Sequence, residues 1–584
     1  MLVFMAMAVG LVIWRLVDVQ VMSSATYSEW GAPQRQAQVE LVAERGAILD
    51  RDLNSLALSD DRPTVWIDPA LVEDPGATAT ALAGVLDVDA AALTDRILRG
   101  GRFMYVDRQI EPALGAEVLA LGLPGVVVDE EPARLLPNGD DFARGVIGRV
   151  DVDQNALTGL EFQYDELLRG ASGFESYERA EDGTLLPTGA REVQAAEHGQ
   201  DLVLTLHRET QFLAEQILVE QVELTEARGG VAVIMRAGTG EVLAAAGVRR
   251  DAETGIASPA GYNMAFLDTY EPGSVNKVFT VSAALEAGLV EPTTEFDVPW
   301  FYDYADKTFS EPFDKGAGRL TVEQIVARSS NIGTIMIAEQ VGPERMRDHL
   351  RDLGFGRFTG SDGGQAVPDE SAGIIPDAFF GTELATIAFG QGVALTPVQV
   401  AAAYNTIANQ GVYVAPTLVR GTVDNEGELH TWPHAPGRRV MSEETAGQVT
   451  DMLESVVSDG TGAFAAVDGY RVAGKTGTAQ KPIAGGYSET DYMSTFVGFV
   501  PADRPELTIL VVLDTETPRH LAGDVAAPLF SELADYVLQT LRVAPSRPEV
   551  EDGLVSDGQD PAAGGSDGAA VDGTGADSSE SGGG

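Results

Sequence analysis

The chain begins with an uninterrupted apolar run. The first 14 residues carry no charged side chain, and at ~1.5 Å per helical residue they span about 21 Å, less than a ~30 Å hydrocarbon core. Continued to Val21, with Arg15 reaching toward the interface, the helix is long enough to cross. The pattern favours a transmembrane anchor over residues 1–22. A secretory signal cleaved near Ser23-Ser24-Ala25 and a buried core helix are the alternatives.

Residues 34–199 alternate short apolar and polar segments with turn clusters such as Asp50-Arg51-Asp52 and Pro137-Asn138-Gly139. Alternation of period two between such turns is typical of strands. We therefore expect a β-rich domain over 34–199. Nothing in its residue spacing is typical of a catalytic site.

From Asp201 onward, strand and helix periods follow each other more clearly. The pattern predicts a strand at 202–206, a helix at 209–223 and a hairpin around Gly238-Thr239-Gly240. The last helix is expected from Pro528, a residue favoured in a first turn, to Arg542. The sequence thus predicts an α+β domain over 201–543. Glycine, aspartate and serine dominate beyond it, which predicts a disordered acidic tail over 545–584.

Charge and cysteine content exclude several classes of function. Lys and Arg number 39 against 89 Asp and Glu, a formal net charge of −50. Such a field repels phosphate backbones, so no nucleic acid is expected as a partner. The absence of cysteine excludes disulfides, thiolate metal sites and a cysteine nucleophile. The six histidines form no H-E-x-x-H pattern, so we expect neither a metal nor a cofactor.

Two of the five lysines lie in sequence patterns that are compatible with a catalytic or binding role. Ser274 and Lys277 are three apart at the start of an apolar helical pattern, so the amine can reach the hydroxyl and, once neutral, act as its base. The other lysine lies in Lys475-Thr476-Gly477-Thr478, which reads as a strand whose glycine marks a close approach by a ligand or another backbone. Because a strand alternates its faces, Lys475 is expected opposite the two threonines, so that this segment edges a cleft.

A third pattern, Ser329-Ser330-Asn331, lies between two predicted helices, the first begun by the capping box Thr321-x-x-Gln324. Taken singly, each pattern has a plain structural explanation. Ser274 and Lys277 could be a helix cap with a surface lysine, Ser329 and Asn331 a pair of caps, and the Lys475 segment an edge strand guarded by a lysine. Their joint occurrence, in this order and using two of five lysines, makes coincidence implausible.

The three patterns together form the motif set of the penicilloyl-serine transferases. The chain resembles the class B penicillin-binding proteins, most closely the cell-division (septal) peptidoglycan D,D-transpeptidases. Further segments carry the resemblance, among them Tyr270-Glu271-Pro272-Gly273-Ser274, Ala388-Phe389-Gly390-Gln391-Gly392, Arg45-Gly46-Ala47 and Gly159-Leu160-Glu161. The family implies a pedestal (dimerisation-type) domain at 34–199 and, at 201–543, a transpeptidase domain with an antiparallel sheet covered by helices.

The resemblance also implies a role for each motif residue. Ser274 would attack the D-Ala-D-Ala carbonyl of a peptidoglycan stem peptide, Lys277 would take its proton, and Ser329 would relay a proton to the departing D-alanine. The substrate-binding residues would be Asn331, Lys475, Thr476, Gly477 and Thr478. The expected partners are stem peptides or their lipid-linked precursor, β-lactams, a SEDS-type glycosyltransferase and other division proteins, with the catalytic domain outside the cell membrane.

Two other functions use the same fold. A β-lactamase or D,D-carboxypeptidase would add water activation, and Glu426-Gly427-Glu428-Leu429-His430 superficially resembles a loop of one β-lactamase class. A solvated hairpin tip explains that segment better. A non-catalytic receptor or scaffold that binds β-lactams is the other alternative.

Overall fold

The computed structural model describes residues 1–23, 36–178, 191–311, 317–362 and 365–546. Two sequence predictions fall largely beyond these ranges. The end of the candidate cleavage site, Ser24-Ala25, lies outside the described residues, as does the predicted tail from residue 547.

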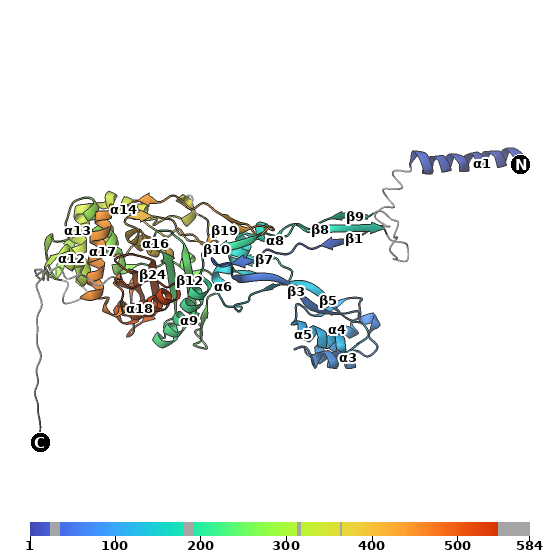
Figure 1. The fold of residues 1–584 in the computed structure, drawn as a ribbon, viewed down its shortest axis with the longest axis horizontal. Coiled ribbons are helices and arrows are strands. Elements are labelled where there is room, and N and C mark those ends of the chain that lie inside the picture. The colour runs from blue at the N-terminus through green and yellow to red at the C-terminus, as the bar shows by residue number, and fades with distance from the viewer. Residues whose placement is uncertain (24–35, 179–190, 312–316, 363–364, 547–584) are drawn as a thin grey trace, which may run out of the picture. The chain divides into compact units, whose positions relative to one another are not determined.

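The N-terminal run is helical, as predicted. Helix α1 covers Leu2–Val17 and continues through a π turn over Asp18–Met22 (Figure 1). Residues Leu2–Gln20 have a mean hydropathy of 2.1 and none of their window is buried against the protein. The helix is therefore long and apolar enough to cross a membrane, and it is not a core helix.

The described part of the pedestal contains strands of three sheets and a set of short helices. One sheet has the antiparallel order β1-β8-β9, from Gln36–Leu41, Gly173–Glu178 and Arg191–Gln194. The second contains β2 (Ile48–Leu49), β3 (Ser55–Ile67), β4 (Met104–Asp107) and β5 (Val126–Leu135). The remaining elements are α6 (Arg144–Ile147), β6 (Arg149–Val150), β7 (Ala156–Thr158), α7 (Gly159–Gln163) and α8 (Asp165–Arg169).

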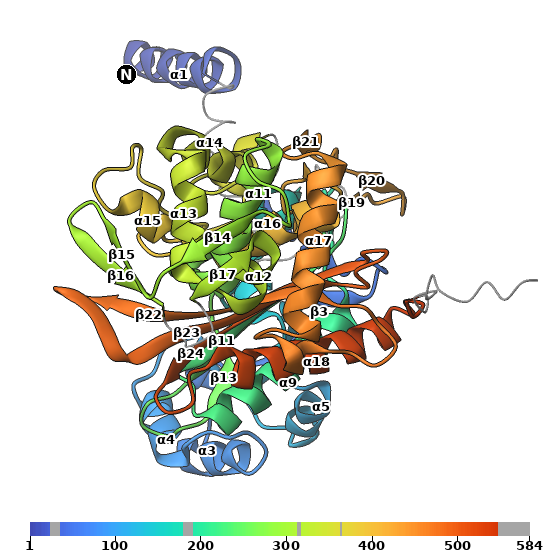
Figure 2. The same ribbon diagram turned by 90° about the vertical axis from the view of Figure 1, so that its left-hand side faces the viewer.

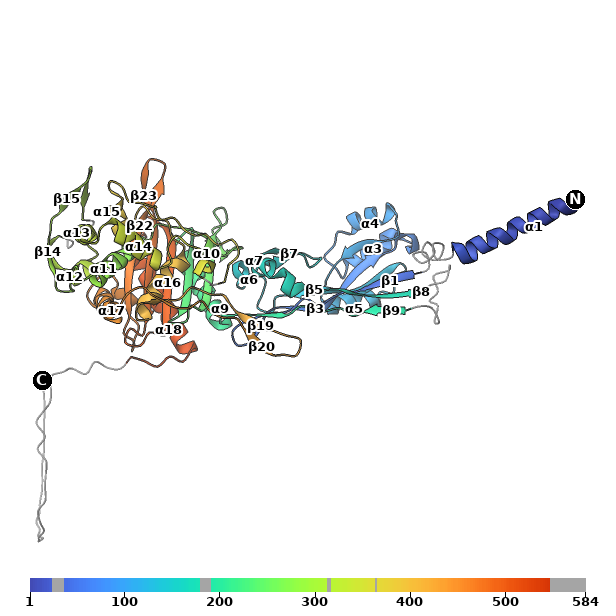
Figure 3. The same cartoon turned by 90° about the horizontal axis from the view of Figure 1, so that it is seen from above.

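Three pedestal helices were not predicted from the sequence. They are α3 (Pro75–Ala83), α4 (Ala90–Leu98) and α5 (Pro112–Ala120), which Figure 3 labels. Their apolar side chains pack against β3, β4 and β5. Asp74 and Asp89 cap α3 and α4 by accepting backbone hydrogen bonds. Proline and aspartate at helix starts are also turn signals, which is why these nine-residue helices resemble loops in the sequence.

The second domain, for which the resemblance implies a transpeptidase, is built on one antiparallel sheet of order β13-β12-β11-β24-β23-β22. Its central strands are continuously apolar because helices cover both faces. Helices α9 and α18 lie on one face, and α11, α16 and α17 lie on the other (Figure 2). The strands are β11 (Gly229–Arg236), β12 (Val242–Arg250), β13 (Ala257–Pro259), β22 (Ala473–Ile483), β23 (Gly486–Val500) and β24 (Leu507–Glu516).

Helices and small hairpins complete this domain. The helices are α9 (Arg208–Thr225), α10 (Met264–Leu267), α11 (Lys277–Glu286), α12 (Val322–Arg328), α13 (Asn331–Val341), α14 (Pro343–Asp352), α15 (Glu383–Ala388), α16 (Pro397–Ala408), α17 (Glu443–Ser458) and α18 (Ala522–Thr540). The small strands are β14 (Glu295–Val298), β15 (Phe301–Tyr304), β16 (Lys307–Ser310), β17 (Gly318–Thr321), β18 (Val412–Tyr413), β20 (Leu429–Thr431) and β21 (Arg438–Arg439).

The predicted start of the last helix is wrong. Helix α18 begins at Ala522, so Pro528 lies inside it instead of in its first turn. Ala522, Val525 and Ala526 are buried against the sheet, and the Ala522 N–H donates to Thr478 Oγ1 at 3.0 Å. Packing and this terminal hydrogen bond outweigh the local preference of proline.

A single sheet joins the two domains. Its order is β20-β19-β10-β2-β3-β4, with β5 also paired to β3. Strand β10 (Asp201–Leu204) pairs in parallel with β2 of the pedestal and antiparallel with β19 (Val419–Val423). The predicted domain boundary near residue 200 therefore falls beside a strand that hydrogen-bonds to both domains.

Candidate active site

Ser274 lies in a tight turn immediately before a buried helix. Gly273–Asn276 form one 3₁₀ turn, and α11 follows from Lys277. Gly273 has φ of +59°, and a Cβ there would lie 3.0 Å from the Ala479 Cβ. Its N–H donates to the carbonyl of Gly390. These close contacts require glycine and fix the half-buried Ser274 against strand β22.

Both motif lysines are completely buried, at 0% exposure. The Lys277 amine donates to the Ser329 carbonyl at 2.5 Å and to Ser329 Oγ at 3.2 Å. The structure therefore brings the first and second motifs together. Within the described residues, the Lys277 amine makes its hydrogen bonds to Ser329. A hydrogen bond between Lys277 and Ser274, the contact predicted from the sequence, is not among them.

The surroundings of the two amines favour their neutral forms. Burial lowers the pKa of Lys277 well below its usual value of 10.5; the nearby Lys475 charge lowers it further, and Glu311 opposes the change. Burial lowers the pKa of Lys475 to about 7. A lysine without its proton at neutral pH is a base, whereas an ordinary surface lysine is not.

Ser329 and Asn331 lie at the junction of α12 and α13. Ser329 ends α12 with φ of +59°, a left-handed conformation that few residues other than glycine adopt. Ser330 is the N-cap of α13, and its Oγ accepts from the Gly333 N–H at 2.9 Å. Asn331 is the first residue of α13 and is half-buried. The predicted capping box at Thr321 is present and begins α12.

The third motif forms part of the edge strand β22. Lys475 is directed into the buried interior, and the two threonines are turned away from it, as alternation requires. Thr476 Oγ1 lies 2.7 Å from Thr461 Oγ1, and Thr478 Oγ1 accepts from α18. A Cβ on Gly477 would lie 2.8 Å from the Pro272 carbonyl oxygen. The predicted close approach is thus made by the backbone of the serine turn.

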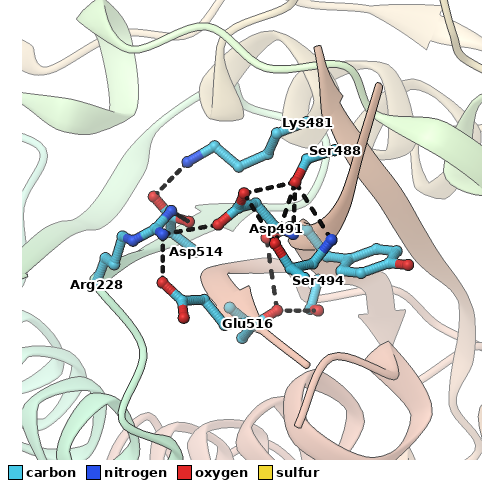
Figure 4. A network of polar contacts seen from close by, with 10 residues as sticks. Arg228, Lys481, Ser488, Asp491, Ser494, Asp514 and Glu516 are labelled. Carbon is cyan, nitrogen blue, oxygen red and sulfur yellow. Dashed lines mark hydrogen bonds and ion pairs between the residues drawn. The ribbon is translucent and has the colours of Figure 1, made fainter. Parts of the chain in front are cut away.

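Beyond the motif, charged side chains anchor the strand end. Lys481 pairs with Asp514 at 2.7 Å, and Arg228 pairs with Asp491 at 2.7 Å and also with Glu516 (Figure 4). Between this network and Tyr270-Glu271 opens a cavity of about 650 Å³. Strand β22 therefore has one end in an ion-pair network and its middle against Ser274.

The segment that resembles a β-lactamase loop lies elsewhere. Glu426, Gly427 and Glu428 are exposed in the turn between β19 and β20. That hairpin belongs to the sheet shared with the pedestal, not to the sheet that carries Lys475. The solvated-hairpin interpretation is confirmed.

One buried residue of this region was missed from the sequence. Glu311 follows β16, is 8% exposed, and binds the junction that carries Ser329 and Asn331. It stands alone between short strand segments, so no spacing or periodicity marks it in the sequence. Only its contacts reveal it.

Comparison with known proteins matches both domains. Residues 230–535 match the penicillin-binding protein transpeptidase domain, and residues 40–204 match the penicillin-binding protein dimerisation domain. Penicillin-binding protein PbpB of Mycobacterium tuberculosis is 34% identical over 85% of this chain and 78% of its own length. Peptidoglycan D,D-transpeptidase FtsI of Escherichia coli is 30% identical over 92% of this chain and 91% of its own.

The fold has a matching relative among solved structures. Penicillin-binding protein 3 of M. tuberculosis, complexed with aztreonam, superposes with a TM-score of 0.67 at 30% identity, covering 87% of this chain and 99% of that one. The fold class and the order of the two matched domains agree with the sequence-based expectation. The chain therefore belongs to the class B penicillin-binding proteins, which join a dimerisation domain to a transpeptidase domain, and is a peptidoglycan D,D-transpeptidase.

Proposed function

We propose that Ser274 is the acyl-accepting nucleophile of this transpeptidase. Its Oγ attacks the D-Ala-D-Ala carbonyl of a stem peptide while Lys277 takes the hydroxyl proton. The tetrahedral intermediate then expels D-alanine, whose amine receives a proton through Ser329. The amine of a second stem attacks the acyl-enzyme, which forms the cross-link and returns the proton to Ser274.

We assign substrate binding to the residues around this turn. Asn331 would hold the substrate amide, and Lys475, Thr476, Gly477 and Thr478 would bind the terminal carboxylate. The backbone N–H groups of Ser274 and Thr478 would stabilise the oxyanion, an effect of about 3 kcal/mol per donor.

One observation carries the assignment. Two fully buried amines with lowered pKa values lie beside the turn of Ser274, and one of them is hydrogen-bonded to Ser329. Burying two such cations has no benefit for folding, because each prefers water. The presence of the two buried amines is explained if Lys277 acts as a base and Lys475 binds the anionic end of the substrate.

The same mechanism accounts for β-lactam binding, which the solved structure of the aztreonam-bound relative supports. A β-lactam would present its strained amide to Ser274 and remain as an ester. A β-lactamase would have to release that ester with water, so a long-lived adduct distinguishes the two functions.

We place the enzyme at the cell membrane, anchored by α1 with its transpeptidase domain outside the cell. The length and exposure of the apolar helix support an anchor. We further propose, from the family resemblance, a role in septal wall synthesis with a SEDS-type glycosyltransferase and other division proteins. The boundaries 34–199 and 201–543 are proposed for the two extracellular domains.

Labelling with a fluorescent penicillin tests the nucleophile. The wild type is expected to form a stoichiometric, long-lived adduct, and Ser274→Ala to form none while keeping its unfolding temperature. Ser258→Ala, the same substitution at an exposed residue of β13, is the matched control and should label fully. An adduct on folded Ser274→Ala would reject the assignment.

A further inference from the structure

A single carboxylate binds three consecutive residues, two of the second motif and the one that follows it. Glu311 Oε1 accepts from Ser330 Oγ at 2.7 Å and from the Ile332 N–H at 2.8 Å, and its Oε2 accepts from the Asn331 N–H at 3.1 Å. The carboxylate is nearly buried, with 8% of the residue exposed. Hydrogen bonds to a buried carboxylate are among the strong ones, so this junction is held tightly.

The contacts of Glu311 stabilise two parts of the site, the start of helix α13 and the residue Ser329. Asn331 begins the 11-residue helix α13, whose positive N-terminal end favours a carboxylate at this place. On the other side is Ser329 in its left-handed conformation, whose carbonyl and hydroxyl both accept from the Lys277 amine. Such a conformation persists only where its surroundings hold it. Glu311 supplies part of that hold through Ser330, the residue next to Ser329.

Glu311 also contributes a charge close to Lys277. Two charged groups act on this amine: Lys475 from β22 lowers its pKa, and Glu311 raises it. The two act in opposite directions on one buried base. Loss of the carboxylate would therefore change both the geometry and the proton affinity of the site.

We propose that Glu311 is a positioning residue of the acylation step. Its carboxylate keeps Ser329, Ser330 and Asn331 in the arrangement that presents the Lys277 amine and the Asn331 amide to the substrate. It acts through these groups and does not itself contact the reacting atoms. The inference rests on the proposed roles of Ser274 and Lys277.

The test is the second-order rate of acylation by a fluorescent penicillin, measured between pH 5 and pH 9 on the full chain. Glu311→Gln keeps the size of the side chain but turns one acceptor into a donor, so we expect the rate to fall about 10- to 100-fold through misplacement. Its neutral side chain no longer raises the pKa of Lys277. The acid limb of the profile, where the rate falls because Lys277 becomes protonated, is therefore expected to move to lower pH.

Glu311→Asp separates the effect of side-chain length from the effect of charge. It keeps the negative charge but shortens the side chain, so the rate should fall while the acid limb stays near its wild-type position. Glu323→Gln is the matched control, because it makes the same change at an exposed residue of α12 that accepts only from Ser455 among the described hydrogen bonds. This control should retain both the rate and the profile.

The outcomes distinguish this inference from the proposed function. Failure of the wild type to acylate would reject the role of Ser274, whereas wild-type rate and profile in Glu311→Gln would overturn only the role of Glu311. If Glu311→Gln does not fold, Ser330→Ala is the variant that tests the inference. It removes one hydrogen-bond donor to the Glu311 carboxylate and leaves the negative charge of that carboxylate in place. A reduced rate with an unmoved acid limb supports the inference, and an unchanged rate overturns it.

Discussion

The protein buries basic side chains in two regions, and the consequence for their charge differs between the two. In the pedestal, Glu161 lies between Arg45 and Arg134, with ion-pair distances of 2.6 and 2.7 Å and all three side chains no more than 5% exposed. In the transpeptidase domain, Lys277 and Lys475 are as deeply buried, but burial lowers the pKa of each, and neither forms an ion pair with a carboxylate of the described residues. Similar burial therefore produces different chemical states.

The difference follows from the residue types. An arginine keeps its proton under nearly all conditions, so burying it requires a carboxylate. A lysine can release its proton, and doing so removes the penalty of burying a charge. The paired arginines hold the pedestal together, whereas the two lysines, without an ion pair among the described residues, leave a reactive amine beside a serine. The comparison predicts that substitutions in the two regions will separate stability from activity.

The largest effect is expected for Lys277→Met. Removing the base should slow acylation by a fluorescent penicillin about 10⁴-fold, which is the upper range for general-base catalysis. The unfolding temperature should not fall, because burial disfavours the charged form of this lysine and methionine brings no charge into the interior. Lys307→Met, at an exposed position of β16, should change neither quantity. A folded Lys277→Met with wild-type acylation would contradict the assigned base.

Glu161→Gln is expected to give the opposite result. It leaves Arg45 and Arg134 buried without their shared carboxylate, a loss of about 3–5 kcal/mol in the free energy of unfolding. Urea unfolding measures this loss, and penicillin acylation per folded molecule should be unchanged. Glu111→Gln removes an exposed partner of Arg62 and should cost less than about 1 kcal/mol. Equal losses in both variants would remove the distinction between the two regions.

The smallest effect, counted per pH unit, is the dependence of stability on pH. An unfolded lysine holds its proton up to about pH 10.5, but folded Lys475 releases it near pH 7. Between these values the unfolded chain binds more protons, so this residue makes stability rise with pH, by at most about 1.4 kcal/mol per unit. Relative to Lys475→Met, the wild type should therefore gain stability from pH 7 to pH 10. A constant difference in unfolding temperature would show that Lys475 stays charged when folded.

The sequence predicted those parts of the molecule that depend on local patterns. The hairpin at Gly238-Thr239-Gly240, the capping box at Thr321 and a strand through Lys475-Thr476-Gly477-Thr478 are present because apolar period, cap and turn chemistry agree there. The start of α18 was missed because its first residues are fixed by contact with the sheet and with Thr478. Tertiary contacts of this kind leave no local signal.

The candidate site shows the same division. Its serines, lysines and asparagine are recognisable because motif spacing follows from the chemistry they share. The partner that the Lys277 amine contacts, Ser329, comes from a chain segment 52 residues away, and helical spacing from Ser274 could not give it. Glu311 belongs to no motif, and its role depends on three hydrogen bonds that only the folded chain brings together.

The sheet shared by the two domains has a mechanical consequence. Strand β10 is bonded on one side to β2 and on the other to β19, so the pedestal and the transpeptidase domain are not joined by a flexible tether. Any tilt of one against the other must bend or twist hydrogen-bonded strands, which resist deformation elastically. A pull applied at the pedestal would thus be transmitted as strain through the backbone, without passing through a loose hinge.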